Sequence, residues 1–168
     1  LRKTLSNIPL GGLRYFEQTG STNDIALAWA AADAPDLALV YAEEQTAGRG
    51  RGSRHWFTPP EAALAFSLVL RPLHVKEQAI PLFSALGALA VCEALAERGL
   101  HPEIKWPNDV LLNRRKVCGI LAESAWLGEH TTRGWTHAQS VTRGMVDTRD
   151  IAKRTGKCLT CHLGSQEK

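Results

Sequence analysis

The sequence contains no long hydrophobic run, and this absence limits what the chain can be. Its longest apolar stretch lies near residues 85–91, which is too short to cross a bilayer. The first ten residues are partly basic but lack the apolar core of a secretory signal. We therefore expect no membrane segment and, with no export signal, a cytoplasmic location.

A strong excess of one charge is also lacking. The 20 Lys and Arg residues exceed the 17 Asp and Glu residues only slightly, so the formal net charge is +3. Such a balance permits an anionic ligand but requires neither nucleic acid nor a membrane surface. At 168 residues with 44% hydrophobic content, the chain has the size and composition of one globular domain.

The chain lacks a P-loop, although its most distinctive stretch is rich in glycine and arginine. Residues 48–56 read GRGRGSRHW, and no Gly-Lys-Ser/Thr follows at the required spacing. Glycine lets the backbone approach a ligand, arginine pairs with phosphate or carboxylate, and Trp56 can stack on a flat ring. A solvated basic loop accounts for these residues equally well, so the rest of the chain has to decide.

Hydrophobic patterns predict short elements of both kinds. In one helix, apolar residues recur with helical spacing at Leu82, Leu86, Leu89 and Leu95, which predicts a stripe that faces the core. Strands of mixed direction, with helices packed mainly on one face of the sheet, give an α+β fold class. The predicted strands are residues 13–17, 37–42 and 63–70, one that ends in the Pro-Asn-Asp turn at 107–109, and residues 110–112 and 116–123; the predicted helices are residues 24–32 and 78–98.

Two groups of polar residues flank the predicted strands. Ser21, Thr22 and Asn23 precede a helix and are typical N-cap residues, but a helix start also offers free N–H groups to a polar or anionic ligand. Lys116 begins an apolar strand, where it can extend to water or point into the same cleft as the arginine-rich stretch. The sequence alone leaves open whether residues 21–23 cap the helix or bind a ligand, and whether Lys116 extends to water or into the cleft.

A series of motifs in one order resembles the biotin–protein ligases. The likeness covers residues 13–123, and Lys-Trp-Pro-Asn-Asp together with Gly-Arg-Gly-Arg is hard to obtain by chance. One departure is Ser53, where the family usually has glycine, with Gly52 one place earlier. The motifs are Ser-Thr-Asn at 21–23, Gln-Thr-Ala-Gly-Arg-Gly-Arg at 45–51, Trp56, Lys-Trp-Pro-Asn-Asp at 105–109 and Arg-Lys-Val-Cys-Gly-Ile-Leu-Ala-Glu at 115–123.

This resemblance implies an enzyme that uses ATP to activate biotin as biotinyl-5′-adenylate and transfers it to one lysine of a biotin carboxyl-carrier domain. It implies that Lys116 and Arg51 are catalytic, with Lys116 bridging the biotin carboxylate and the α-phosphate. The implied biotin-binding positions are Ser21, Thr22, Asn23, Gln45, Arg49, Gly50, Arg51 and Lys116. The positions implied for ATP and its Mg²⁺ are Arg54, Trp56 (stacked on adenine), Lys105, Asn108 and Asp109.

The resemblance ends after Glu123. Relatives continue with a strand of Gly-x-Gly-Ile-Asn pattern that supplies an asparagine to the nucleotide, and residues 124–168 contain nothing similar and no sustained apolar period. We therefore divide the chain into an incomplete catalytic domain, 1–123, and an atypical tail, 124–168, that is disordered or frameshifted. The tail's Cys158, Cys161 and His162 match a haem-attachment motif, but an accidental sequence is the simpler interpretation.

Three alternative functions remain open. One is a truncated remnant that is weakly active or inactive and at most binds biotin. Another is a lipoate–protein ligase, which shares the architecture but generally carries an Arg-Arg-x-x-Gly-Gly-Gly loop that is absent here. A nucleic-acid-binding module would require a wider basic patch. Nothing before Leu1 can form a helix-turn-helix, so we expect no DNA-binding domain, and a homodimer is left open.

Overall fold

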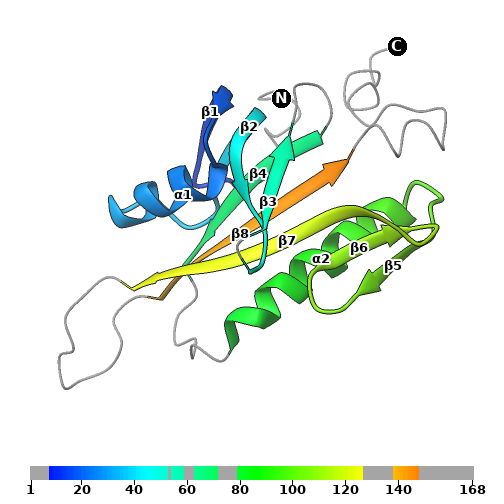
Figure 1. Cartoon of the computed structure of the whole chain (residues 1–168). Coiled ribbons are helices and arrows are strands. Elements are labelled where there is room, and N and C mark those ends of the chain that lie inside the picture. The colour runs from blue at the N-terminus through cyan, green and yellow to red at the C-terminus, as the bar shows by residue number, and fades with distance from the viewer. Residues whose placement is uncertain (1–7, 53, 59–62, 72–78, 127–137, 148–168) are drawn as a thin grey trace, which may run out of the picture.

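The chain folds around one mixed β-sheet. The computed structural model describes residues 8–52, 54–58, 63–71, 79–126 and 138–147, and within them it has eight strands and two α-helices (Figure 1). The strand order is β1-β2-β4-β8-β7-β6-β5, and β3 pairs with β2 outside this path. β1 and β2 are parallel, whereas the other pairs are antiparallel. The predicted α+β class with a mixed sheet is confirmed.

In the first half of the chain, the glycine- and arginine-rich stretch is partly strand rather than wholly loop. The predicted strand 37–42 continues to residue 49 because Gly48 pairs with Trp56 and Arg49 pairs with His55. Most of the stretch is therefore a β-hairpin, closed by a hydrogen bond of 2.6 Å from the Gly50 N–H to the Arg54 carbonyl. The elements are β1 Gly12–Thr19, α1 Thr22–Ala31, β2 Ala38–Arg49, β3 His55–Thr58 and β4 Ala63–Leu70.

The second half contains the predicted helix and hairpin. Asn113 and Arg114 have φ values of 49° and 64°, the left-handed conformation that a tight two-residue hairpin turn requires, and they join β6 to β7 as expected. The elements are α2 Ile80–Ala96, β5 Pro102–Lys105, β6 Asp109–Leu112, β7 Arg115–Trp126 and β8 Ala138–Asp147.

The strand β8 contradicts the expectation that no regular element follows Glu123. β7 continues to Trp126, and β8 lies between β4 and β7 in the interior of the sheet (Figure 1). The backbone N–H and C=O groups of β8 form hydrogen bonds with a partner strand on each side. The strand therefore needs no regular apolar period of its own. Residues 138–147 contain no asparagine, so the nucleotide-site asparagine implied by the resemblance is absent from β8. Cys158, Cys161 and His162 lie outside the described residues.

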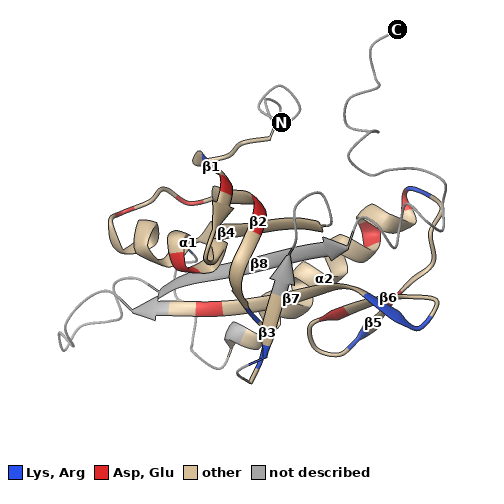
Figure 2. Ribbon diagram, turned by 45° about the horizontal axis from the view of Figure 1, so that its top comes forward, with Lys and Arg blue, Asp and Glu red and all other residues tan. Residues whose placement is uncertain are grey.

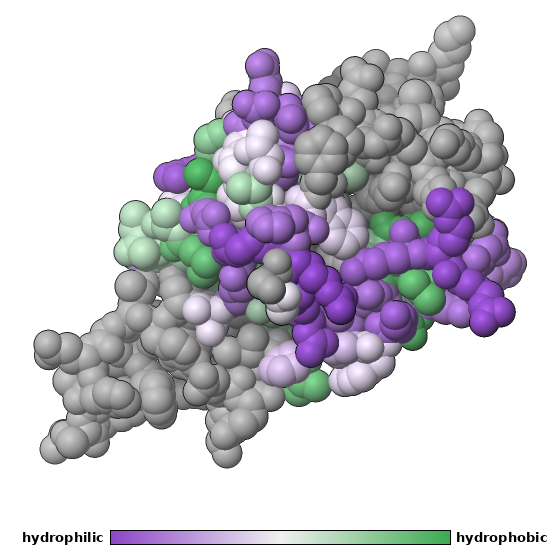
Figure 3. Space-filling model, in the orientation of Figure 1, coloured by the Kyte–Doolittle hydropathy of each residue, from purple (hydrophilic) through white to green (hydrophobic). Residues whose placement is uncertain are grey.

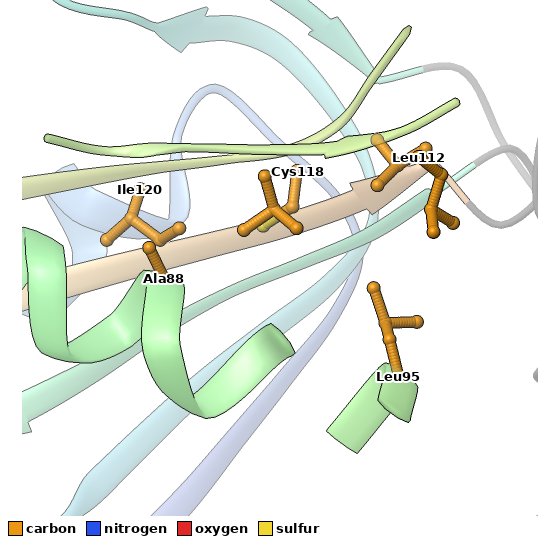
Figure 4. Close-up of a cluster of buried hydrophobic side chains, with 7 residues drawn as sticks. Ala88, Leu95, Leu112, Cys118 and Ile120 are labelled. Atoms are coloured by element: carbon orange, nitrogen blue, oxygen red, sulfur yellow. The ribbon is translucent and has the colours of Figure 1, made fainter. Parts of the chain in front are cut away.

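The two helices lie on opposite faces of the sheet rather than on one. In the strand register, Ser67 of β4 and Leu121 of β7 both pair with residue 143 and so share a face, while Ile120 points to the other. α1 contacts the Ser67 face, because the Ser67 hydroxyl lies 2.9 Å from the Thr22 hydroxyl. α2 packs on the Ile120 face, where Ala88 points toward Ile120 (Figure 4).

Each helix has its own small core. Under α1 the buried residues are mostly alanine and valine, namely Ala26, Ala30, Ala34, Ala38, Val40 and Val69. Under α2 they are Ala88, Leu95, Val110, Leu112, Val117, Cys118 and Ile120 (Figure 4). The small residues under α1 let the helix approach the sheet closely, which brings its N-terminus near the polar residues described below.

The outward face of α2 differs from the sequence-based expectation. Leu82, Leu86 and Leu89 are 59%, 59% and 47% exposed, whereas Leu95 and Ala88 are buried. The predicted stripe was therefore only partly right. The helix is apolar on nearly every side, so its periodicity does not decide which side meets the sheet. Neither described helix combines the length and the apolar character that crossing a membrane would require.

We predict that Leu112→Ala destabilises the fold and that Leu86→Ala does not. Leu112 is 4% exposed inside the cluster under α2, so truncation leaves a cavity that costs about 2–5 kcal/mol. Leu86 has the same side chain at 59% exposure, so its truncation changes the free energy of unfolding by less than about 0.5 kcal/mol. Urea denaturation followed by circular dichroism measures both, and equal losses would contradict the assignment of this core.

Candidate functional site

A hollow lies beside the β2–β3 hairpin. It is open to solvent, and several separate segments contribute to its wall. Positive charges gather near the tip of this hairpin and the β6–β7 turn (Figure 2), and hydrophilic residues cover the surface around the hairpin (Figure 3). The lining residues are Arg49, Gly50, Arg51, Trp56, Asn108, Lys116, Gly119, Ile120 and Leu121. The fold thus brings together six predicted site positions that span residues 49–116.

Lys116 points into this hollow between a carboxylate and an aromatic ring. Its Nζ lies 2.6 Å from Asp109 Oδ1 and 4.6 Å from the centre of the Trp56 ring. The side chain is 35% exposed, so the ammonium group is accessible from the hollow. Of the two orientations left open by the sequence, the structure has the one in which Lys116 shares a cleft with the arginines. This arrangement holds a positive charge where an anion can approach it.

A cluster of buried polar side chains lies at the N-terminus of α1. The Gln45 Oε1 accepts hydrogen bonds from the Thr22 N–H at 2.8 Å and from the Thr22 hydroxyl at 3.0 Å. The Ser67 hydroxyl donates to Asn23 Oδ1 at 2.6 Å. These four side chains are fully buried, so their orientations are fixed by mutual hydrogen bonds.

Ser21 stands out within this cluster. It is the N-cap residue of α1, yet its side chain makes no capping hydrogen bond. It is only 2% exposed, and its hydroxyl oxygen has no hydrogen-bond partner among the residues that the structure describes. A buried hydroxyl without a partner is costly, which favours a ligand group as its partner over simple capping.

Arg49 connects the polar cluster to the hollow. Its Nη1 donates to Asp24 Oδ1 at 2.5 Å, and its Nη2 donates to the two Glu123 oxygens at 3.1 and 3.0 Å. The hydrogen bond to Asp24 raises the pKa of Arg49 above its already high ordinary value, partial burial opposes the rise, and the charge of Glu123 adds to it. Arg49 therefore keeps its positive charge at any physiological pH. Asn23 Nδ2 donates to the same Glu123 carboxylate at 2.5 Å.

Three predicted nucleotide residues lie away from the lining. Arg54 and Lys105 are exposed, and neither belongs to the wall of the hollow. Lys105 pairs with Asp109 across β5 and β6, one strand from the lining. Asp109 reaches the hollow only through its ion pair with Lys116. Ser53, the position that departs from the family pattern, lies outside the described residues.

The sequence analysis missed four residues that the structure places at the site. Ser67, Asp24 and Glu123 hydrogen-bond to predicted site residues, and Gly119 lies under Lys116 and Trp56. Signals existed for two of them. Ser67 interrupts an apolar strand with a polar residue, and a glycine inside an apolar strand such as Gly119 often marks a close approach. Glu123 ends the motif at 115–123 but was given no role, and Asp24 carried no local signal, because their partner Arg49 is distant in sequence.

The fold and site define a ligase-like domain that combines a cationic hollow with a buried polar cluster. The chain belongs to the biotin/lipoate A/B protein ligase family, whose model matches residues 15–135. It is 42% identical over 112 residues to the bifunctional ligase/repressor BirA of Bacillus subtilis, and this alignment covers 66% of this chain and 34% of that protein. It is 43% identical over 113 residues to the biotin–[acetyl-CoA-carboxylase] ligase of Mycobacterium tuberculosis, and this alignment covers 64% of this chain and 42% of that protein.

The structure is similar to solved ligases as well. The biotin protein ligase of Leishmania major, solved in complex with biotinyl-5-AMP, matches with a TM-score of 0.63 and 26% identity, covering 92% of this chain and 74% of that chain. The matched segments span less than half the length of each of the two sequence relatives.

Proposed function

We propose that this chain binds biotin and ATP, forms biotinyl-5′-adenylate and transfers the biotinyl group to a lysine of a biotin carboxyl-carrier domain. The observation that carries the proposal is the hollow in which Arg49, Arg51 and Lys116 lie beside the buried polar cluster at Ser21. Two anions, a carboxylate and a triphosphate, repel each other, and fixed cations are needed to bring them together. The family membership and the adenylate bound to the Leishmania major ligase support the same reaction.

In the proposed first step, a biotin carboxylate oxygen attacks the α-phosphorus of ATP. A bond forms between that oxygen and phosphorus, the bond to the β-phosphate oxygen breaks, and pyrophosphate leaves. Lys116 neutralises the carboxylate and the α-phosphate as they approach, and Arg51 stabilises the same charges. In the second step, a neutral lysine amine of the carrier attacks the acyl carbon, AMP leaves with the bonding electrons, and the amine nitrogen loses one proton to solvent as the amide forms.

The polar cluster is the proposed site for the ureido ring of biotin. That ring offers both hydrogen-bond donors and an acceptor, and Ser21 has a buried hydroxyl available for it. Thr22 donates a hydrogen bond to Gln45, and Asn23 accepts one from Ser67, so these bonds fix the side chains around the proposed ureido site. The proposed adenine site is the face of Trp56, and Arg54 and Lys105 are the proposed contacts to the rest of the nucleotide.

A Mg²⁺ ion fits the residues present. Magnesium in nucleotide sites is usually held by one or two carboxylates together with phosphate oxygens and water. Asp109 has one buried carboxylate oxygen whose only described partner is the Lys116 ammonium, and Asn108 lines the hollow next to it. These two residues would hold the ion, which would supply further neutralisation of the phosphate charge.

A biotinylation assay tests the proposal. The reaction contains this chain, ATP, Mg²⁺, biotin and a carrier domain of an acetyl-CoA carboxylase, the partner class named in the Mycobacterium tuberculosis relative. Mass spectrometry should find one carrier lysine heavier by one biotinyl group, and a carrier whose target lysine is arginine should remain unmodified. Modification with lipoate instead of biotin would support the lipoate–ligase alternative.

A biotin-binding remnant is the second candidate, because the chain matches less than half the length of its sequence relatives. Calorimetry with biotin distinguishes the two candidates. Biotin binding without pyrophosphate release or carrier labelling would favour the remnant. Binding accompanied by both activities would exclude it.

We predict that Arg51→Gly causes the chain to lose the adenylate. Arg51 lies on the exposed turn of the β2–β3 hairpin and lines the hollow, so its side chain can cover the reactive phosphate ester and exclude water. Release and hydrolysis of biotinyl-5′-adenylate should be faster by roughly 10-fold or more. Rapid gel filtration with labelled ATP measures how much adenylate stays bound.

The matched control for this prediction is Arg114→Gly. Arg114 is an exposed arginine in the β6–β7 turn, and its positive φ of 64° suits glycine. Adenylate retention should equal that of the unaltered chain. Equal retention in Arg51→Gly as well would show that the hairpin does not close over the intermediate.

A further inference from the structure

Glu123 occupies a position where three distant parts of the chain meet. Its carboxylate on β7 accepts hydrogen bonds from Asn23 at the start of α1 and from Arg49 at the end of β2. These partners are 100 and 74 residues away in sequence. The carboxylate therefore links three separate elements, α1, β2 and β7.

The hydrogen bonds determine how Asn23 is oriented. Its Nδ2 donates to Glu123 Oε2 at 2.5 Å and its Oδ1 accepts from the Ser67 hydroxyl at 2.6 Å. An amide with a carboxylate on one side and a hydroxyl donor on the other has one favourable orientation. Since Asn23 is fully buried, a reversed amide would face Glu123 with its oxygen and leave two acceptors in contact.

The same carboxylate holds the guanidinium of Arg49. The second anionic partner, Asp24, has a side chain that is 54% exposed, whereas that of Glu123 is 28% exposed. Water screens the Glu123 ion pair less than the Asp24 pair, so both carboxylates hold Arg49, and Glu123 also holds Asn23. Arg49 lines the hollow, and Asn23 belongs to the polar cluster.

We propose that Glu123 is a positioning residue that fixes Asn23 and Arg49 together and thereby aligns the polar cluster with the cationic hollow for one ligand. The inference rests on the proposed function for the identity of that ligand, biotin. Glu123 is not among the lining residues of the hollow and acts through its two partners. Its loss weakens biotin binding, and the chemical step at saturating biotin changes much less.

The experiment compares Glu123→Gln, Glu123→Asp and Glu44→Gln with the unaltered chain. Glu123→Gln keeps the shape and removes the charge, and Glu123→Asp restores the charge on a shorter side chain. Glu44 is a half-buried β2 carboxylate that accepts a hydrogen bond from Gln18. The biotin Kd is measured by calorimetry, and pyrophosphate release is measured at saturating ATP. Thermal unfolding checks that each variant is folded.

We expect Glu123→Gln to raise the Kd and KM for biotin by roughly 10- to 100-fold, the effect of losing charge-assisted hydrogen bonds, while kcat changes by less than about 3-fold. Glu123→Asp should recover part of the affinity, and Glu44→Gln should behave like the unaltered chain. In an Arg49→Lys background, Glu123→Gln should have a smaller effect, because the two residues act as a unit. A biotin Kd for Glu123→Gln equal to that of the unaltered chain, or fully additive effects in the double variant, would overturn the inference.

A measurement independent of biotin separates this inference from the proposed function. In ¹⁵N NMR spectra, the Arg49 side chain should be ordered in the unaltered chain and mobile in Glu123→Gln. If the unaltered chain binds no biotin while Arg49 shows this difference, the proposed function fails and Glu123 remains a positioning residue. If Arg49 is equally mobile in both proteins, the positioning role fails whatever the chain binds.

Discussion

Lys116→Ala is expected to abolish pyrophosphate release while the chain remains folded. Lys116 places a positive charge in the hollow at 2.6 Å from Asp109 and 4.6 Å from the Trp56 ring centre. In the proposed reaction that charge neutralises two anions as they approach each other. Removing a positioned group of this kind lowers kcat by about 10²- to 10³-fold. The rate is measured as pyrophosphate released with biotin, ATP and Mg²⁺.

Two further variants separate charge from folding in this experiment. Lys116→Ala leaves a buried Asp109 oxygen without its partner, so some stability is lost. Lys116→Gln retains a hydrogen-bond donor for Asp109 but has no charge, and it should be as inactive as Lys116→Ala and more stable. Arg98→Ala removes an exposed cation at the end of α2 and should leave the rate unchanged. An unaltered rate in Lys116→Gln would contradict a catalytic role for the lysine charge.

Gly119→Ala should have the second largest effect, although it adds only one methyl group. A Cβ on Gly119 would lie 2.9 Å from both Cε and Nζ of Lys116 and 3.2 Å from Trp56 Cζ3. The end of a lysine side chain is flexible and can move away, so the protein should fold. The movement displaces the ammonium from its place beside Asp109, and a displacement near 1 Å can reduce a rate by roughly 10²-fold.

The control for this glycine is Gly20→Ala. A Cβ on Gly20 meets only the Cβ of Ala47, at 4.0 Å, which is an ordinary van der Waals contact. Thermal unfolding should show both alanine variants folded, and pyrophosphate release should fall only in Gly119→Ala. If Gly119→Ala retains full activity, the position of the Lys116 ammonium is not critical for the reaction.

Much of the local structure could be predicted from the sequence. The strand 63–70 and the turn at Asn113 and Arg114 were predicted correctly, and the helix 78–98 was predicted with an excess of two residues at each end. These elements have strong local causes, namely unbroken apolar runs, a terminal glycine at Gly99 and a tight turn between strands. The extension of β2 to residue 49 depends on pairing with β3, and a pairing partner has no local signature.

The strand β8 shows the same limit more clearly. Its ten residues carry no sustained alternation, and the sequence analysis assigned them to an atypical tail. Its backbone nevertheless pairs with β4 on one side and β7 on the other. The neighbours supply the hydrogen bonds, so the strand exists because of its place in the sheet and not because of its own pattern. The division at residue 123 and the origin of the tail stay predictions.

The sequence by itself determined the family, because its ordered motifs bring specific residue types at specific spacings, and the family match over residues 15–135 confirmed it. It also supplied six of the residues that line the hollow. Only the tertiary structure decided which residues hold them. Glu123 meets Asn23 and Arg49 across 100 and 74 residues, and Gly119 makes room for Lys116 beside Trp56. Such contacts depend on strand order and register, which arise from packing of the whole sheet and leave no trace in any local window of sequence.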